Sequence, residues 1–392
     1  MEIKFIHSFV ANNAQPIFLL SFKMMNVLSL VSYNFLPPKM GGQKCIASFN
    51  EWLSKRVNLT CVSTQSNNPA LASYSLHNIL SNSSFRYANV LYFFTIKKII
   101  KQKNITHLII EHPYYGWLAF LLKIFLRVKI IVHSHNIESM RFKSIDKKWW
   151  EILWYYEKWI HNKADANFFI TENDMQYAMN NFGLQKSKCT VITYGFNLQQ
   201  IPNVAQNQIA SATIRHQFNI AANDKILLFN GTLSYKANLN ALDIILQKIN
   251  PLLQQQKFHY KIIVCGKDLP VGYNNLQHHK NIIYAGFVDD IDAYYLATDV
   301  FINPVNEGGG IKTKIVEALG FNISLVTTKS GAIGIPENIV GNKMKVIEDD
   351  DWVAFANAIT TIKIDTDLHE DYFKFFYWEK IAAKALVAIE EC

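Results

Sequence analysis

The sequence has few charged residues and few cysteines, and each shortage excludes a class of protein. Only 18 % of its 392 residues are charged and half are hydrophobic, which excludes an intrinsically disordered chain. Its 16 glycines and 10 prolines follow no short period, which excludes collagen-like and low-complexity proteins. The five cysteines lie far apart without a CxxC pair. This excludes a disulfide framework and a thiolate metal site, and it indicates a reducing compartment.

The sequence also lacks a long apolar run. A membrane-spanning helix needs roughly 18 uninterrupted apolar residues, and the best candidate, residues 117–126, is short and contains Lys123. Residues 1–23 have no apolar core of the kind found in signal peptides. We therefore expect a cytoplasmic protein with an N-terminal extension that is either disordered or the product of a misassigned start.

The net charge of +8 is divided unevenly along the chain. Residues 26–195 carry 20 basic and 9 acidic side chains, a net +11, whereas residues 196–392 carry 17 and 21, a net −4. The first half therefore favours an anionic surface or substrate as its partner. A positively charged, solvated surface is an alternative explanation of these counts. Nucleic-acid binding is another, although the chain has no recognised nucleic-acid module.

Apolar, β-branched runs alternate with helix-length segments in two successive series. The predicted strands are 27–35, 57–64, 106–112, 129–135, 166–171 and 190–195, then 225–231, 260–267, 281–287, 299–305 and 323–329. Such runs indicate parallel sheets that are covered on both faces. The predicted fold is α/β, with two doubly wound, Rossmann-like domains, a linker at 197–208 and ligands bound in the cleft between the two sheets.

Two loops after strands of the first half contain residues suited to binding a ligand. Gly41 and Gly42 precede a helix, where backbone amides could approach a phosphate, although a plain strand-to-helix turn explains the pair as well. His135 follows the fourth predicted strand and could hydrogen-bond a hydroxyl or phosphate of a ligand, or be satisfied by loop backbone. His133 lies on the same face, but we expect no cysteine or third histidine nearby and therefore no metal.

The strongest pattern is the loop and helix of residues 303–320. Three glycines follow a strand and open the helix, as in a backbone anion nest: Gly308, Gly309 and Gly310. Lys312 and Lys314 lie in or near the first turn, where cations oppose the helix dipole unless an anion is bound. Glu317 lies on the face of Lys314 and could accept hydrogen bonds from ribose hydroxyls. The alternative is a surface ion pair between Lys314 and Glu317.

Two aromatic or apolar segments have a structural interpretation and a functional one. Residues 149–161 are apolar almost all round, which favours a buried helix over a cofactor-binding segment. Residues 117–129, with the basic residues 97–103 nearby, favour a core helix, and the alternative is contact with a membrane surface.

In their order and spacing these pieces resemble the family-4 glycosyltransferases of the GT-B fold, from about residue 26 to the C-terminus. The motifs that match are PPKMGG, HSHNIE, YEKWIHNKADANFFIT, VITYGFN, FNGTLSYKAN and GGGIKTKIVEAL. The resemblance implies an acceptor domain at 24–200, a donor domain at 201–370, and a final segment, 371–392, that packs back on the first domain.

The resemblance also implies an activity: transfer of a sugar, with retention, from a nucleotide diphosphate sugar to an acceptor hydroxyl in cell-surface polysaccharide or glycolipid synthesis. By the same resemblance, Glu317 holds the donor ribose and Lys314 lies near the donor phosphates. Gly41 and Gly42 close on the diphosphate and sugar, and His135 lies near the transferred sugar. No metal is implied, because a helix N-terminus and lysines replace it at the leaving diphosphate.

The sequence departs from the family pattern at two positions. Gly309 stands where the family has the first of two glutamates, and Glu307 is offset from it by two residues. An arginine that the family often has in the first loop of the second lobe is replaced near Thr232, and Lys236 or Lys312 could supply its charge.

The resemblance and the charge pattern together imply a set of partners. These are a nucleotide sugar, a glycan or lipid-linked acceptor and the inner face of an anionic membrane, without nucleic acid. The alternatives are a sugar-nucleotide epimerase or hydrolase of the same fold, and a two-lobed sugar-binding protein.

Overall fold

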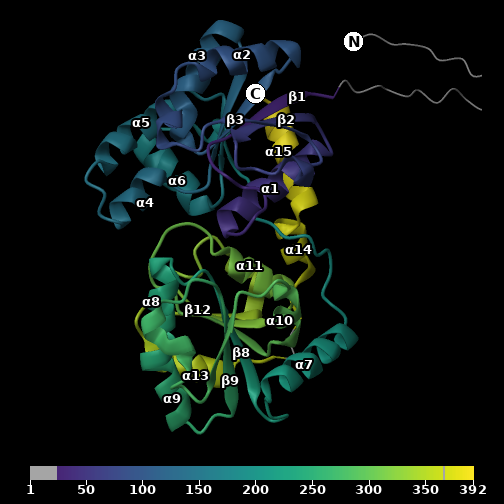
Figure 1. Cartoon of the computed structure of the whole chain (residues 1–392), viewed down its shortest axis with the longest axis vertical. Helices are drawn as coiled ribbons and strands as arrows, with labels where there is room; N and C mark the ends of the chain where they lie inside the picture. The colour runs from purple at the N-terminus through teal and green to yellow at the C-terminus, as the bar shows by residue number, and fades with distance from the viewer. Residues whose placement is uncertain (1–23, 365–366) are drawn as a thin grey trace, which may run out of the picture.

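The computed structural model describes residues 24–364 and 367–392, so the expected N-terminal extension lies outside the described residues. Two lobes lie one above the other, each built on a parallel sheet with helices on both faces (Figure 1). The strand order is β3-β2-β1-β4-β5-β6-β7 in the first lobe and β10-β9-β8-β11-β12-β13 in the second. The predicted α/β fold of two doubly wound, Rossmann-like domains is confirmed.

The first lobe alternates strands and helices from Asn26 onward. Its strands are β1 (Asn26–Val31), β2 (Asn58–Thr64), β3 (Ser75–Leu80), β4 (His107–Glu111), β5 (Lys129–Ser134), β6 (Ala166–Phe169) and β7 (Cys189–Val191). Its helices are α1 (Gly41–Ser54), α2 (Tyr92–Gln102), α3 (Gly116–Leu126), α4 (Glu138–Ser144), α5 (Trp150–Lys163) and α6 (Glu172–Phe182). The glycine pair predicted to precede a helix forms the first turn of α1.

The second lobe repeats the alternation. Its strands are β8 (Lys225–Asn230), β9 (Tyr260–Cys265), β10 (Ile282–Gly286), β11 (Val300–Asn303), β12 (Ser324–Thr328) and β13 (Met344–Ile347). The helices that follow the first lobe are α7 (Val204–Phe218), α8 (Lys236–Ile244), α9 (Asn250–Gln255), α10 (Ile291–Ala297), α11 (Thr313–Gly320), α12 (Glu337–Val340), α13 (Trp352–Thr361), α14 (Glu370–Phe376) and α15 (Trp378–Glu390).

Two strands were absent from the sequence prediction, β3 and β13. Both lie at a sheet edge, where a strand has one neighbour and its side chains are partly solvated, so the apolar run that marks a central strand is missing. In β3 only Leu80 is buried. The strand that precedes His135, predicted as the fourth, is therefore β5.

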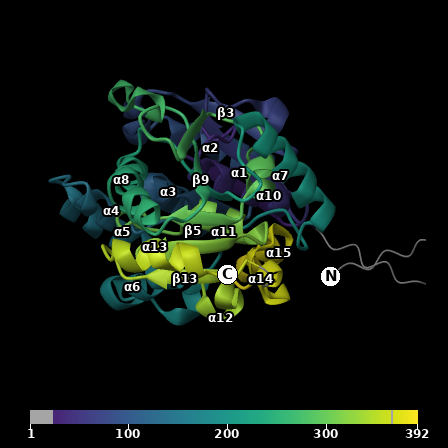
Figure 2. The same ribbon diagram turned by 90° about the horizontal axis from the view of Figure 1, so that it is seen from below.

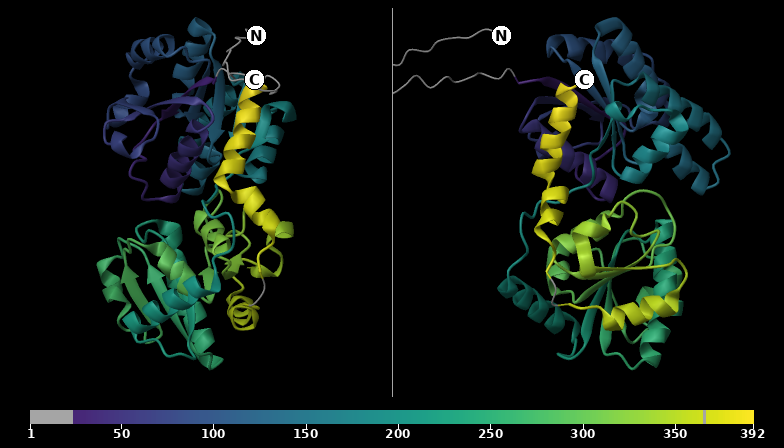
Figure 3. Two further views of the ribbon diagram at one scale, coloured as in Figure 1. Left: turned by 90° about the vertical axis from the view of Figure 1, so that its right-hand side faces the viewer. Right: turned by 180° about the vertical axis from the view of Figure 1, so that it is seen from behind.

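The linker between the lobes is shorter than predicted. Helix α7 begins inside the predicted linker, because the Asn203 side chain accepts a hydrogen bond from the backbone N–H of Gln206 and caps the helix. After the second sheet, α14 packs against α11 and α12, and α15 packs against α1 of the first lobe. The chain returns to the first lobe beside Phe196, whose N–H donates a hydrogen bond to the carbonyl oxygen of Phe376 at 2.9 Å. Figure 3 shows α14 and α15, in yellow, running from the second lobe up along the first, and Figure 2 shows the two helices next to each other from below.

The two apolar segments form helices that are buried on one side only. In α5 the side chains of Ile160 and His161 are buried, but Ile152 is 73 % and Tyr155 is 69 % exposed. The predicted helix is present as α5, but it is buried on one face only and its other face exposes apolar side chains. In α3 the last turn exposes Phe125. Within 24–364 and 367–392, no helix combines the length and the apolar character that crossing a membrane requires.

Candidate active site

The two lobes meet where the carboxyl ends of their strands face each other, and glycines allow the close approach. A Cβ added at Gly41, the first residue of α1, would lie 2.7 Å from Thr313 Oγ1 at the start of α11. A Cβ added at Gly310, where φ is +70°, would overlap the side chain of Asn136 from the first lobe. Predicted site residues of both lobes are thus brought together at the N-terminus of α11.

Glu317, in α11, links the two lobes. Its Oε1 accepts hydrogen bonds from Lys44 Nζ of α1 at 3.0 Å and from the Tyr194 hydroxyl, beyond β7, at 2.8 Å. Its Oε2 accepts a hydrogen bond from the hydroxyl of Tyr295 in α10 at 3.2 Å. Burial first, and the Glu317 charge second, raise the pKa of both tyrosines well above the usual value. The tyrosines therefore remain hydrogen-bond donors at neutral pH.

The Lys314 side chain bonds to residues of β8 and α8 rather than to Glu317. Its Nζ donates to Asn230 O and to Asn238 Oδ1, both at 2.9 Å, and lies 4.5 Å from the centre of the Phe229 ring. Burial and, to a smaller extent, the charge of nearby Lys312 lower the pKa of Lys314 to about 7. The alternative of a surface Lys314–Glu317 ion pair is therefore wrong, because Glu317 pairs with Lys44 instead.

The glycine loop is wrapped around the ammonium of Lys312. Gly308 and Gly310 have φ values of +87° and +70°, and Lys312 Nζ donates to the carbonyls of Gly308, Gly309 and Gly310 at 2.9, 3.3 and 3.0 Å. In a trans peptide the N–H points opposite to the preceding C=O. The N–H groups of Gly309, Gly310 and Ile311 therefore point away from Lys312. Lys312 therefore stabilises the loop from the side opposite to these N–H groups.

In the first lobe, His135 belongs to a buried cluster at the ends of two adjacent strands. Glu111 of β4 pairs in register with His133 of β5. The Glu111 Oε2 atom lies 2.7 Å from His135 Nε2 and 2.9 Å from His133 Nδ1. Although burial alone would raise its pKa, the two histidines hold the pKa of Glu111 well below its usual range. Burial acts to lower the pKa of His135, but Cys45 and Glu111 raise it to about 8.

Comparison with known proteins places this arrangement in a family. Residues 41–200 match the family described as Glycosyltransferase Family 4, and residues 224–365 match the family described as Glycosyl transferases group 1. The chain belongs to the family-4 glycosyltransferases.

Individual relatives of this glycosyltransferase are distant in sequence. The O-antigen biosynthesis glycosyltransferase WbnH of Escherichia coli is 23 % identical over 274 residues, which span 69 % of this chain and 71 % of WbnH. A glycosyltransferase of Rickettsia africae superposes with a TM-score of 0.72 at 16 % identity, over 94 % of this chain and 99 % of that one. Anabaena Alr3699/HepE, solved in complex with UDP and glucose, superposes with a TM-score of 0.70 at 14 % identity. The match covers 93 % of this chain and 99 % of that one. The shared fold is the two-lobed GT-B arrangement.

The cluster around His135 in the glycosyltransferase has the residue types of a metal site but the distances of hydrogen bonds. Zinc held by bonds of 2.0–2.1 Å keeps its tetrahedral ligands roughly 3.3 Å apart. The separations of 2.7 and 2.9 Å between Glu111 and the two imidazoles are shorter. Glu111 is therefore hydrogen-bonded to His135, although the ligand atoms of Glu111, His133 and His135 also lie within 4.8 Å of one another, as in a group that could hold a metal ion.

Several residues of this site were not predicted from the sequence. Glu111, Cys45 and His112 surround His135, and the His112 ring stacks on it with 4.5 Å between centroids. The prediction that no cysteine or third histidine lies near His135 is wrong, because the fold brings Cys45 and His112 to it. The signal that could have found Glu111 is its position at the last residue of a strand that neighbours β5.

The glutamate of HSHNIE supports the same loop. Glu138 lies 3.1 Å from His112 Nδ1 and accepts hydrogen bonds from Arg141 and, at 2.5 Å, from the Tyr114 hydroxyl. Buried Glu157 accepts from the backbone N–H of Glu138 at 2.8 Å and so caps α4. Burial raises the pKa of Glu157 to about 7. The loop that follows β5 is therefore held by carboxylates.

The first turn of α8 lies beside the glycine loop. The Asn240 amide donates to Glu307, and Asn238 accepts from Lys314. Lys236, the first residue of α8, is exposed. The predicted roles of Lys236 and Glu307 toward a donor remain predictions.

Proposed function

We propose that this glycosyltransferase takes its sugar from a nucleoside diphosphate sugar that binds between the lobes against α11. The observation that supports this most is the combination of outward-pointing N–H groups in the loop of Gly308–Gly310 with the Glu317 carboxylate farther along the same helix. The first suits a diphosphate and the second suits the hydroxyls of a ribose. Anabaena HepE, which binds UDP in its solved complex, makes UDP the first nucleotide to test.

We propose further that transfer proceeds with retention and without a metal ion. The bond from the anomeric carbon to the diphosphate breaks, and the acceptor hydroxyl oxygen forms the new bond on the same face. Its proton passes to the departing phosphate oxygen. The negative charge that develops on the diphosphate is stabilised by the N–H groups of the loop and by lysines. Activity should then be unchanged in the presence of EDTA.

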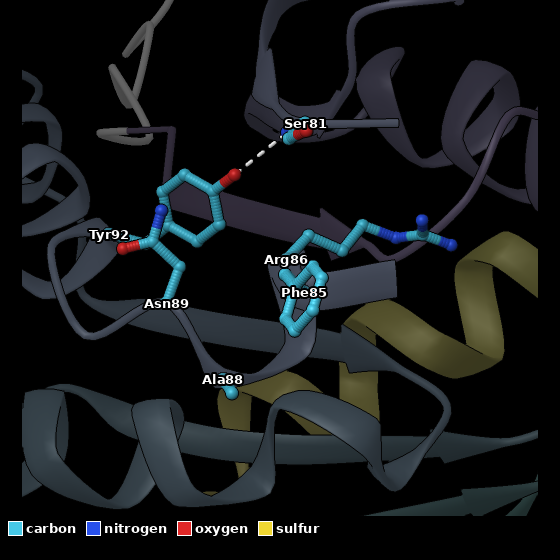
Figure 4. Close-up of a pocket in the computed structure, with 6 residues that line it drawn as sticks. All are labelled: Ser81, Phe85, Arg86, Ala88, Asn89 and Tyr92. Atoms are coloured by element: carbon cyan, nitrogen blue, oxygen red, sulfur yellow. Dashed lines mark hydrogen bonds between the residues drawn. The ribbon is translucent and has the colours of Figure 1, made fainter. Parts of the chain in front are cut away.

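The relatives support a role in O-antigen or polysaccharide synthesis, and the first lobe offers a surface for a lipid-linked acceptor. Between the end of β3 and the start of α2 lies a cavity of about 340 Å³. In Figure 4, Phe85 and Tyr92 line it and the Tyr92 hydroxyl points to Ser81. Phe85 is 84 % exposed and Phe94 is 65 % exposed. We propose that this surface, with the lysines of α2, docks on an anionic membrane.

The donor proposal is tested by titrating nucleoside diphosphates into Glu317→Gln in a calorimeter. The amide cannot accept as strongly as the carboxylate, and hydrogen bonds to a charged group are each worth about 1.5–3 kcal/mol. Affinity for the diphosphate that binds the wild type should therefore fall about tenfold or more. Glu337→Gln, an exposed change in the same lobe, is the control. Wild-type affinity in Glu317→Gln would exclude this donor site.

Product analysis separates transfer from the alternative activities of the same fold. An epimerase or hydrolase converts the sugar nucleotide without an acceptor, whereas the proposed enzyme needs one. Incubation of the donor alone should therefore leave it unchanged over the time in which an added lipid-linked acceptor is glycosylated.

A further inference from the structure

The Glu317 carboxylate has too few free lone pairs to bind a ribose as it stands. It accepts three hydrogen bonds, from Lys44, Tyr194 and Tyr295. A carboxylate offers about four lone-pair sites, and two ribose hydroxyls would bring the demand to five. At least one of the three donors must leave when a nucleotide binds.

Lys44 is the donor that can leave at least cost. Tyr194 is 3 % and Tyr295 is 1 % exposed, and a buried hydroxyl that loses its acceptor loses a hydrogen bond that water cannot replace. The Lys44 side chain is 38 % exposed, so water can solvate its ammonium when it moves. Lys44 also comes from the opposite lobe, on a long flexible chain.

The position of Lys44 determines where its charge can go. It lies in the first turn of α1, three residues after Gly41, and Gly41 contacts Thr313 at the start of α11. The first turn of α1, which carries Lys44, therefore faces the start of α11, the helix that carries Glu317. Among the lysines of that region, Lys312 is bound to three carbonyls and Lys314 to Asn230 and Asn238.

We propose that Lys44 exchanges partners during donor binding. In the free enzyme it pairs with Glu317, and when the nucleotide ribose takes Glu317, Lys44 moves to the diphosphate and supplies the positive charge that Thr232 lacks. This inference rests on the proposed function, because it assumes a nucleotide at Glu317. Lys44 thus acts as a competitor of the ribose and as a partner of the phosphates.

These two roles predict effects of opposite sign for Lys44→Met. A nucleoside has a ribose but no phosphate, so loss of the competing lysine should tighten its binding about two- to fivefold, as expected for a half-exposed ion pair. A nucleoside diphosphate also loses a charge-assisted contact, so its binding should weaken about tenfold. Lys44→Arg keeps the charge and should restore affinity for the diphosphate.

The experiment is calorimetric titration of the full-length protein with uridine and UDP, guanosine and GDP, and adenosine and ADP. Lys55→Met, at the other end of α1, is the matched control because Lys55 lies over the Trp52 ring, away from Glu317. Thermal unfolding of each variant checks that it folds. Opposite changes for nucleoside and diphosphate in Lys44→Met support the exchange.

Each other outcome overturns the inference. Equal loss for nucleoside and diphosphate assigns Lys44 a structural role between the lobes, and no change for either removes it from the site. If Glu317→Gln loses nucleotide binding in those cases, the proposed function stands and only the exchange fails. If no nucleotide of the panel binds the wild type, the proposed function and the exchange fail together.

Discussion

The two lobes line their shared cleft with different chemistry. In the first lobe the polar groups are carboxylates paired with histidines, as in Glu111 with His133 and His135. In the second they are lysines bound to backbone carbonyls and an amide, as in Lys312 and Lys314. The half of the chain with net charge −4 thus places two lysines at the cleft, whereas the half with +11 places a buried carboxylate there beside its histidines. Net charge along the chain does not predict the sign of the charge at the site.

The largest effect that we predict is a loss of stability when Glu111 is separated from the histidines of the first lobe. Glu111→Ala leaves two buried imidazoles without their carboxylate, and breaking a buried ion pair from one side costs about 3–5 kcal/mol. Urea unfolding at pH 7 should show a loss of that size. Glu51→Ala, which removes a carboxylate bonded to exposed Ser73, should cost less than about 1 kcal/mol. Equal losses would mean that the Glu111 cluster contributes no more than a surface contact.

Glu111→Gln tests the electrostatic part of the same interaction. The neutral amide no longer stabilises the imidazolium, so the pKa of His135 should fall below its value of about 8. The raised pKa adds stability below the unfolded-state pKa near 6.5, and this contribution disappears as the pH rises through 8. NMR titration of the His135 ring in both proteins measures the change without any substrate. An unchanged midpoint would assign the raised pKa to Cys45 instead.

The features that the sequence predicted are those encoded in short segments. Central strands such as β5 appear as apolar runs, and the glycine loop with Glu317 spans ten residues, so both could be predicted. The residues that were missed come from distant segments: Lys44 is 273 positions from Glu317 and Tyr194 is 123. No local period links such residues, because the fold alone brings them together. The edge strands β3 and β13 were missed because half-exposed strands lack a continuous apolar run.

An effect of intermediate size is expected on the pH dependence of stability, and it comes from the buried lysines of the second lobe. Because burial lowers the pKa of Lys314 from 10.5 to about 7, the unfolded chain holds one more proton than the folded chain between these values. Stability should therefore rise with pH across this window. The slope is at most 1.36 kcal/mol per pH unit, or roughly 2.7 kcal/mol from pH 7 to 9.

Lys314→Met removes this proton and should remove the part of the rise that Lys314 contributes. Lys312, whose pKa burial lowers to about 8, remains in the variant, so the difference between the two proteins isolates Lys314. Urea unfolding of wild type and variant at pH 7, 8 and 9 measures it. A constant difference in free energy of unfolding over these pH values would mean that Lys314 stays charged in the folded protein, with a pKa above 9. The contrast between a neutral-prone lysine in the second lobe and a charged histidine in the first would then be lost.

The smallest effect tests whether only the first lobe meets a membrane. Leu91 and Phe94 are each 65 % exposed beside the cavity of the first lobe, and Val271 is 96 % exposed in the second. If the first lobe docks on anionic lipid, the double change Leu91→Ser and Phe94→Ser should weaken binding to phosphatidylserine vesicles about three- to tenfold, because apolar side chains that enter the interface add to the attraction of the lysines. Val271→Ser removes an even more exposed apolar side chain from the acidic lobe and should leave binding unchanged. Cosedimentation at low salt measures both, and equal losses in the two variants would show that the vesicles do not distinguish the lobes.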